Sequence, residues 1–199
     1  EGQVANFRTD SALPVERLQH AINYYLPLAI SVLDAAEAPP GFHAQRCAVS
    51  KSYRYRILRS EVRRPLRERH TFRVRQSLDL AAMQECVHAL PPGPHDFAVF
   101  AAEQFRYKST IRELHRAELV RVGDEIRFTI EANGFLYNMV RSVVGTLIHV
   151  GRGKMRPEEF AAMLHTRDRS KCGPTAPPQG LCLVAVYYEQ PPVSPSETA

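Results

Sequence analysis

The sequence predicts a mixed α/β or α+β fold, built on a sheet with helices packed against it. Stretches with the two-residue period of a strand alternate along the chain with stretches that have the helical period. Gly123-Asp124 separates two strand-like stretches, which predicts a hairpin. The chain has 199 residues, 44% of them hydrophobic, which suits a sizeable core, and it contains no apolar run long enough to cross a membrane.

The expected elements follow one another along the whole chain. Strands are expected at 2–9, 29–38, 51–60, on the two sides of the hairpin within 110–132, and at 180–189. Helices are expected at 13–27, 78–90, 134–150 and 156–165. Pro14 and Pro157 stand in first turns, where proline is favoured, and Asp79 is placed to cap the second helix.

The positive charge of the chain is concentrated in one region. Between Arg46 and Arg75 there are eleven Lys or Arg residues and two acids, Glu61 and Glu68, whereas the whole chain has a net charge of only +5. Such a basic region on an otherwise mildly acidic protein indicates a polyanionic partner such as nucleic acid. The alternative is a solvated strand whose arginines keep a sheet edge soluble.

Arg141 is the sharpest anomaly in the sequence, because it lies in the most apolar helix expected. An unpaired buried charge is very costly, so the guanidinium needs a partner. Gly145 follows one turn later and leaves room for a group to approach. We weigh two interpretations: an arginine that holds a catalytic carboxylate or a phosphate, and an arginine that reaches the surface and pairs with an acid there.

Tyr53 lies on a strand with two different faces. Tyr53, Tyr55 and Ile57 point one way, while the arginines between them point the other way. A tyrosine on a basic strand can stack on a nucleic-acid base while neighbouring arginines hold phosphates. The alternative is a tyrosine that only fills the core.

Several common sites are not predicted. His43 and Cys47 are four residues apart but have no further ligands near them, so we predict no metal site. The glycines at 151–154 lack the preceding strand and the spacing of a phosphate-binding loop. The four cysteines are far apart with no CxxC pair, which is typical of reduced thiols in the cytoplasm.

Seven segments carry a resemblance that covers nearly the whole chain. They are GQVANFRTD (2–10), INYYLP (22–27), FHAQRCAVSKSYRYRI (42–57), HDFAVF (95–100), STIREL (109–114), FTIEANGFLYNMVRSVVGTLIHVGRGK (128–154) and RDRSKCGPTAPPQGLCLVAV (167–186). In this order they resemble the tRNA pseudouridine synthase A family. The resemblance implies the pseudouridine synthase fold, an α+β fold with a mixed, mostly antiparallel sheet flanked by helices. It also implies that 1–40 is the remainder of an N-terminal catalytic half, 41–190 the C-terminal half and 191–199 a disordered tail.

The first of these segments concerns the nucleophile. In the family the catalytic aspartate lies in a loop of the type G-R-T-D-x-G-V-H-A, which a strand of the type G-Q-V-x-x-F-x-T-D follows. Arg8-Thr9-Asp10 is similar to the second pattern, because Phe7 stands where the loop requires glycine. We therefore expect Asp10 to be a strand-end residue and the nucleophilic aspartate to be absent from this chain, and we expect this fragment alone to be inactive and less stable than an extended version.

The resemblance also implies roles for individual residues. Tyr53 matches the active-site tyrosine that packs against the target uridine and helps to remove its carbon-5 proton. Arg141 matches the basic residue that pairs with the catalytic carboxylate, and Leu181 matches an apolar residue that lines the pocket for the base. The expected substrate-binding residues are Tyr53, Leu181, Lys51, Arg54 and Arg56.

The activity implied by the resemblance is isomerisation of uridine to pseudouridine in the anticodon stem–loop of tRNA, at positions 38 to 40. The reaction needs no metal or organic cofactor, and the resemblance implies a homodimer in the cytoplasm with tRNA as its partner. The alternative is a catalytically inactive module of the same fold that only binds structured RNA. A metabolite enzyme with a phosphate site is weaker, because the sequence has no phosphate loop.

Overall fold

The computed structural model describes residues 1–102 and 107–189, and these fall into two compact units. Residues 1–3 and 49–186 form the first unit, and residues 4–48 form the second together with 187–189. The tail expected to be disordered at 191–199 lies outside the described residues. No helix in the described part of the chain is both long and apolar enough to cross a bilayer.

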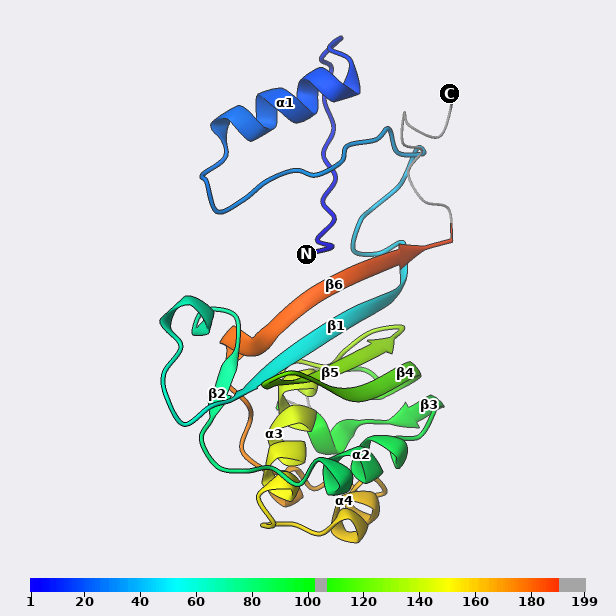
Figure 1. The fold of residues 1–199 in the computed structure, drawn as a ribbon. Coiled ribbons are helices and arrows are strands. Elements are labelled where there is room, and N and C mark those ends of the chain that lie inside the picture. Colours follow the sequence, from blue (N-terminus) through cyan, green and yellow to red (C-terminus); the bar gives the residue numbers. More distant parts are fainter. Residues whose placement is uncertain (103–106, 190–199) are drawn as a thin grey trace. The chain divides into compact units, whose positions relative to one another are not determined.

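The first unit is built on a six-stranded mixed sheet (Figure 1). Its strands are β1 (Ala48–Arg59), β2 (Phe72–Val74), β3 (Gly93–Asp96), β4 (Ile111–Val122), β5 (Glu125–Ala132) and β6 (Leu181–Tyr188). The pairs β1–β5, β5–β4 and β4–β3 are antiparallel, whereas the short pair β1–β2 is parallel. Strand β6 also pairs with β1, so β1 lies inside the sheet. This is the α+β arrangement that the sequence predicts.

The hairpin between β4 and β5 confirms the turn expected at Gly123. Gly123 adopts φ +62°, a conformation that glycine reaches at little cost and that tight hairpin turns require. Val122 lies directly opposite Glu125, so the register begins at the turn. The pairing slips between Leu114 and Arg116, and the slip marks an irregularity in β4.

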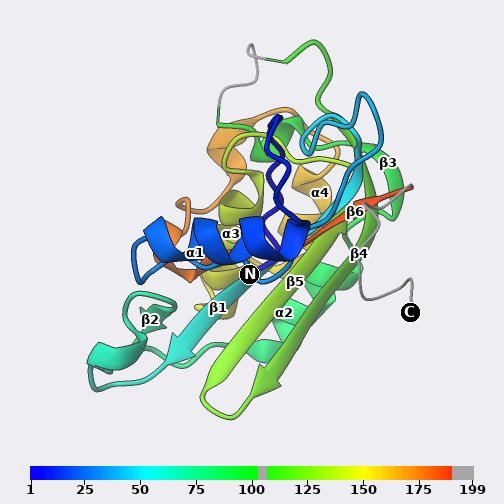
Figure 2. The same cartoon turned by 90° about the horizontal axis from the view of Figure 1, so that it is seen from above.

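Helices cover one face of this sheet, as Figures 1 and 2 show from two sides. They are α2 (Leu80–His88), α3 (Met139–Gly151) and α4 (Pro157–Met163). Asp79 caps α2 by accepting a hydrogen bond from the Ala82 amide at 3.0 Å, as expected. Of the thirteen residues of α3, only Arg141 and His149 are not buried, so this helix is the centre of the core.

Helix α3 begins at Met139, five residues after the start expected from its apolar pattern. Asn138 precedes it in the left-handed conformation, at φ +59°, which a helix cannot continue. The apolar residues before it, Phe135 and Leu136, pack against the same core from a loop. The hydrophobic pattern therefore predicted correctly that these residues are buried, but it placed the start of the helix too early in the sequence.

The second unit contains helix α1 (Val15–Tyr25), as expected, but no strand at 2–9 or 29–38. Both strand predictions are wrong for these described residues, which form no ladder; only Glu37 takes part in an isolated bridge. Side chains bind this backbone instead. The Gln19 amide donates to the Leu33 carbonyl at 2.8 Å, and the Asn23 side chain bonds both the amide and the carbonyl of Val32.

Candidate functional site

Strand β1 separates the expected site residues onto two faces of the sheet. Tyr53 and Tyr55 pack into the core on the side of α3. Arg54 and Arg56 lie on the opposite face and line an open pocket. Since adjacent strand residues point to opposite sides, the sequence correctly predicted this division.

Tyr53 is half-buried beside a second aromatic ring. Its ring meets Phe135 edge to face, with 5.1 Å between ring centroids and an interplanar angle of 85°. Burial raises the pKa of the Tyr53 hydroxyl above its ordinary value, so the phenol is neutral near neutral pH. Lys51 lies two residues earlier, on the same face of β1.

Arg141 is held by neutral oxygen atoms. Its Nε donates to the Ala176 carbonyl at 2.7 Å, and its Nη1 donates to Oδ1 of Asn138 at 2.8 Å. Within residues 1–102 and 107–189, no carboxylate forms an ion pair with it. The pairing with a surface acid that we weighed from the sequence is therefore wrong for these residues. The guanidinium is fixed in position, and its charge is not compensated by an acid there.

Gly145 brings a distant segment onto α3. A Cβ at this position would lie 1.8 Å from the Pro174 carbonyl oxygen, so only glycine allows this approach. The Gly173 amide donates to the Thr146 hydroxyl at 3.1 Å, and the Ala176 amide donates to the Arg141 carbonyl at 3.0 Å. The room beside Gly145 that the sequence indicated is thus filled by the chain itself.

The same segment continues to Tyr55 and Leu181. The Tyr55 hydroxyl donates to the Pro177 carbonyl at 2.6 Å, and a Cβ on Gly180 would meet the Tyr55 ring at 2.6 Å. Burial raises the pKa of Tyr55, against the opposing charge of Arg141. Leu181 opens β6 and packs against the core, as Tyr53 does. Residues 173–181 thereby link Arg141, Tyr55 and Leu181.

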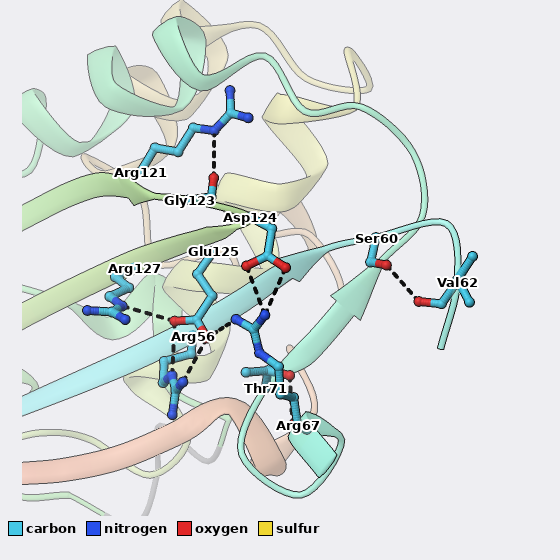
Figure 3. Close-up of polar contacts among 10 residues, drawn as sticks. All are labelled: Arg56, Ser60, Val62, Arg67, Thr71, Arg121, Gly123, Asp124, Glu125 and Arg127. Carbon is cyan, nitrogen blue, oxygen red and sulfur yellow. Dashed lines mark hydrogen bonds and ion pairs between the residues drawn. The ribbon is translucent and has the colours of Figure 1, made fainter. Parts of the chain in front are cut away.

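The arginine face of the sheet holds a cluster around one buried carboxylate (Figure 3). The Glu125 side chain is 2% exposed and accepts hydrogen bonds from Arg56 at 2.7 and 3.1 Å, from Arg127 at 2.9 Å, and from Arg67. Arg67 also donates to Asp124 at 2.8 and 2.9 Å. Sequence reasoning missed Glu125, because nothing local marks an acid at a hairpin as the centre of three arginines.

Two opposing effects set the pKa of Glu125: burial and the hydrogen bonds from the arginines. Burial alone would raise the pKa, but the hydrogen bonds from Arg56, Arg67 and Arg127 outweigh it and lower the pKa to about 2. The carboxylate therefore stays ionised at any ordinary pH. Arg56, which the sequence assigned to substrate binding, has its Nε and Nη2 occupied by Glu125.

A pocket of about 380 Å³ opens beside this cluster. Its basic and acidic lining residues are Arg54, Arg56, Arg69, His70, Arg127 and Glu1. Leu181 lines the pocket as well as packing against the core. Arg54 and Arg56 therefore face this pocket, while Tyr53 and Arg141 belong to the other side of the sheet.

Asp10 lies in the second unit, where it is exposed and outside any helix or strand. The strand end expected there is therefore absent. Its neighbours Thr9 and Ser11 form a short turn, in which the Ser11 amide donates to the Thr9 hydroxyl at 3.1 Å. All four cysteines are free thiols.

The domain is of the α+β class, with helices on one face of its sheet and arginines on a separate face. Among the described residues, Arg141 is fixed in position without an acid partner. Such an arrangement is suited to polyanionic substrates. Comparison with known proteins identifies the particular family. The family model for tRNA pseudouridine synthase matches residues 92–189.

Curated relatives named tRNA pseudouridine synthase A match over nearly the whole chain. The relative from Syntrophotalea carbinolica is 46% identical over 94% of this chain and 74% of its own length. Those from Halalkalibacterium halodurans and Moorella thermoacetica are 44% and 43% identical, over 90% and 94% of this chain and 68% and 76% of their own lengths. The chain belongs to the tRNA pseudouridine synthase family.

Proposed function

We propose that this protein isomerises uridine to pseudouridine in tRNA, within the anticodon stem–loop. Family membership supports the reaction, and the relatives are named for it. The observation that carries the proposal for this chain is the setting of Arg141, a guanidinium fixed by two neutral oxygens with no described carboxylate on it. Such a cation suits a catalytic carboxylate that must remain ionised in a dry pocket.

The proposed roles follow the chemistry of the reaction. A carboxylate attacks the sugar carbon of the glycosidic bond and displaces the base. The base turns, and its carbon-5 bonds to the same sugar carbon as the carboxylate leaves. The carbon-5 proton then passes to a base, and the ring nitrogen that was bonded to the sugar takes up a proton. Arg141 holds the nucleophilic aspartate, which we propose is not among residues 1–199. Tyr53 packs against the target base and helps to remove the proton, and Leu181 supports the base. The half-buried neutral phenol and its contact with Phe135 support this assignment of Tyr53.

Lys51, Arg54 and Arg56 are proposed to bind the tRNA. The target uridine is otherwise stacked, so it has to be turned out, and backbone contacts hold the RNA while this happens. We further propose that the protein is a homodimer in the cytoplasm. Sedimentation of the purified protein and fractionation of the cells test these two points.

Tritium release from carbon-5-labelled tRNA tests the activity, with the protein as its gene encodes it. We expect release by the unsubstituted protein and a strong loss in Tyr53→Phe, because the hydroxyl that assists proton removal is gone. Tyr24→Phe removes a hydroxyl from a ring that is 82% exposed and serves as the matched control. Tight tRNA binding without any tritium release would favour the inactive RNA-binding module instead.

A further inference from the structure

We propose that Arg54 and Arg69 form a clamp for one phosphate of the tRNA backbone, in the pocket on the arginine face of the sheet. The inference rests on the proposed function and adds a site to it. Strand β1 pairs with both β6 and β2, and its pairing with β2 covers only Ile57 to Arg59. The pocket lies where the partner of β1 changes from β6 to β2. Its walls come from β1, β5, the residues just before β2 and the start of β6.

The first step concerns which arginines are already occupied. Arg56 and Arg127 lie directly opposite each other on β1 and β5, a position in which like charges repel. Glu125 holds both of them, and together with Arg67 they bring four N–H donors to its two oxygens. An ionised carboxylate has about four acceptor positions, so Glu125 has no capacity left for another cation.

The second step concerns the arginines that are left. Arg54 and Arg69 line the same pocket, and within the described residues neither guanidinium has a hydrogen bond or an ion pair. Among the described residues, Glu1 is the only acid on the pocket wall, and its charge acts on Arg56. Counting Glu1 and Glu125 against the four guanidinium groups of the wall leaves two positive charges without a counter-ion.

The third step concerns the kind of group that fits. The part of the pocket wall that the structure describes contains no Phe, Tyr or Trp, so it offers no aromatic platform of the kind on which a base stacks strongly. Guanidinium groups instead match the geometry of phosphate oxygens, often through two parallel hydrogen bonds. The cavity of about 380 Å³ is also within the range of small-ligand sites. A backbone phosphate is therefore the group that this wall recognises.

The fourth step connects the pocket to the proposed uridine site. Leu181 lines the pocket and also belongs to the core on which Tyr53 packs. A phosphate held at Arg54 and Arg69 would fix the register of the tRNA strand without reading its sequence. The clamp thus places the RNA, and the residues on the opposite face of β1 act on the base.

The test measures tRNA affinity across a series of KCl concentrations. In the double variant Arg54→Gln with Arg69→Gln we expect several-fold weaker binding at about 0.1 M salt. The plot of log affinity against log salt becomes shallower by about 0.7 to 0.9 for each phosphate that is no longer neutralised. The matched control is Arg121→Gln with Arg152→Gln, which removes the same charge from exposed positions outside the pocket. The control is expected to keep the slope of the unsubstituted protein.

Two outcomes would overturn the inference. If the double variant keeps the slope of the unsubstituted protein, or changes it no more than the control does, Arg54 and Arg69 hold no phosphate. If the unsubstituted protein itself neither binds tRNA nor releases tritium, the proposed function fails and the clamp fails with it. If the double variant keeps the slope and the unsubstituted protein releases tritium, the clamp is wrong but the proposed function stays intact.

Discussion

Arg141 and Arg56 belong to opposite sides of the same sheet and are held by different kinds of partner. Arg56 meets a carboxylate that is almost fully buried, and two other arginines share that carboxylate. Among residues 1–102 and 107–189, Arg141 meets only a backbone carbonyl and an amide oxygen. A cation saturated by its own acid stabilises the fold, whereas a cation held by neutral dipoles keeps its charge available for another anion. The two arginines therefore differ in their partners: Arg56 shares a carboxylate, whereas Arg141 is held by neutral oxygen atoms.

The largest effect is expected from removing the acid at the centre of the arginine cluster. Glu125→Gln keeps the shape but removes the negative charge that Arg56, Arg67 and Arg127 share, and among the described residues only Arg67 retains another acid partner, Asp124. We expect a loss of about 3–5 kcal/mol in the free energy of unfolding, measured by urea denaturation. Asp124→Asn is the control, because that side chain is 45% exposed and its ion pair should be worth less than about 1 kcal/mol. Equal losses in both variants would contradict a special role of Glu125.

Acid should remove the same stabilisation from the unsubstituted protein. The pKa of Glu125 is about 2 in the folded chain and 4.5 as the ordinary value, so the unfolded chain binds the proton first as the pH falls. The contribution, on the order of 3 kcal/mol, is complete above pH 4.5 and disappears as the pH falls through about 2. Urea denaturation at a series of pH values should show the gap between the unsubstituted protein and Glu125→Gln closing over this window. A gap that stays constant would count against the cluster.

Changing Arg141 should affect the reaction more than the stability of the fold. Arg141→Lys keeps a positive charge but loses the fork that bonds Ala176 and Asn138, so the charge is no longer fixed. We expect kcat for tritium release to fall by about 100-fold or more, the size expected when one electrostatic interaction with a transition state is removed. Arg152→Lys, just after the end of α3, is the matched control and should leave kcat unchanged. Unchanged kcat in Arg141→Lys would remove this residue from the mechanism.

The packing of α3 against residues 173–177 can be disturbed through one glycine. In Gly145→Ala the new methyl group would lie 1.8 Å from the Pro174 oxygen, so the segment must move. We expect about 1–3 kcal/mol of lost stability together with reduced tritium release, because Arg141 loses its Ala176 partner. Gly134→Ala is the control, since its methyl group would meet only the Arg112 side chain at ordinary distances of 3.6 and 3.7 Å. Full activity in Gly145→Ala would show that Arg141 does not depend on this segment.

The smallest effect is expected from a single hydroxyl. Tyr55→Phe removes the hydrogen bond to the Pro177 carbonyl while keeping the buried ring. We expect a loss of about 1 kcal/mol in the free energy of unfolding, the usual contribution of a single hydrogen bond. Thermal or urea denaturation measures it. A loss as large as that of Glu125→Gln would mean that this bond holds the whole segment in place.

The elements predicted correctly are those whose causes are local. Asp79 caps α2 three residues away, and Gly123 makes its turn between adjacent strands. The strands expected at 2–9 and 29–38 fail because a strand requires a partner backbone, which a single segment does not reveal. Side-chain amides can hold such a segment instead, as Gln19 holds the Leu33 carbonyl.

The candidate site shows the same limit. The apolar pattern around Arg141 predicted that it needs a partner, but that partner, Ala176, comes from a segment 35 residues away. The charge pattern predicted a basic region, but it did not show that Glu125 neutralises part of it from 69 residues beyond Arg56. Residue types indicate what a site requires, and only the folded chain shows which requirements are met internally.

Glu125, which accepts four hydrogen bonds from three arginines, also determines how the charge of this cluster depends on pH. Glu125 loses its proton near pH 2, and guanidinium groups keep theirs to strongly alkaline pH. The cluster therefore presents the same charge throughout the range in which cells live. Acidification within that range would leave the charge of Glu125 and its three arginines unchanged, so a polyanion that approached this cluster would meet the same charge at every such pH.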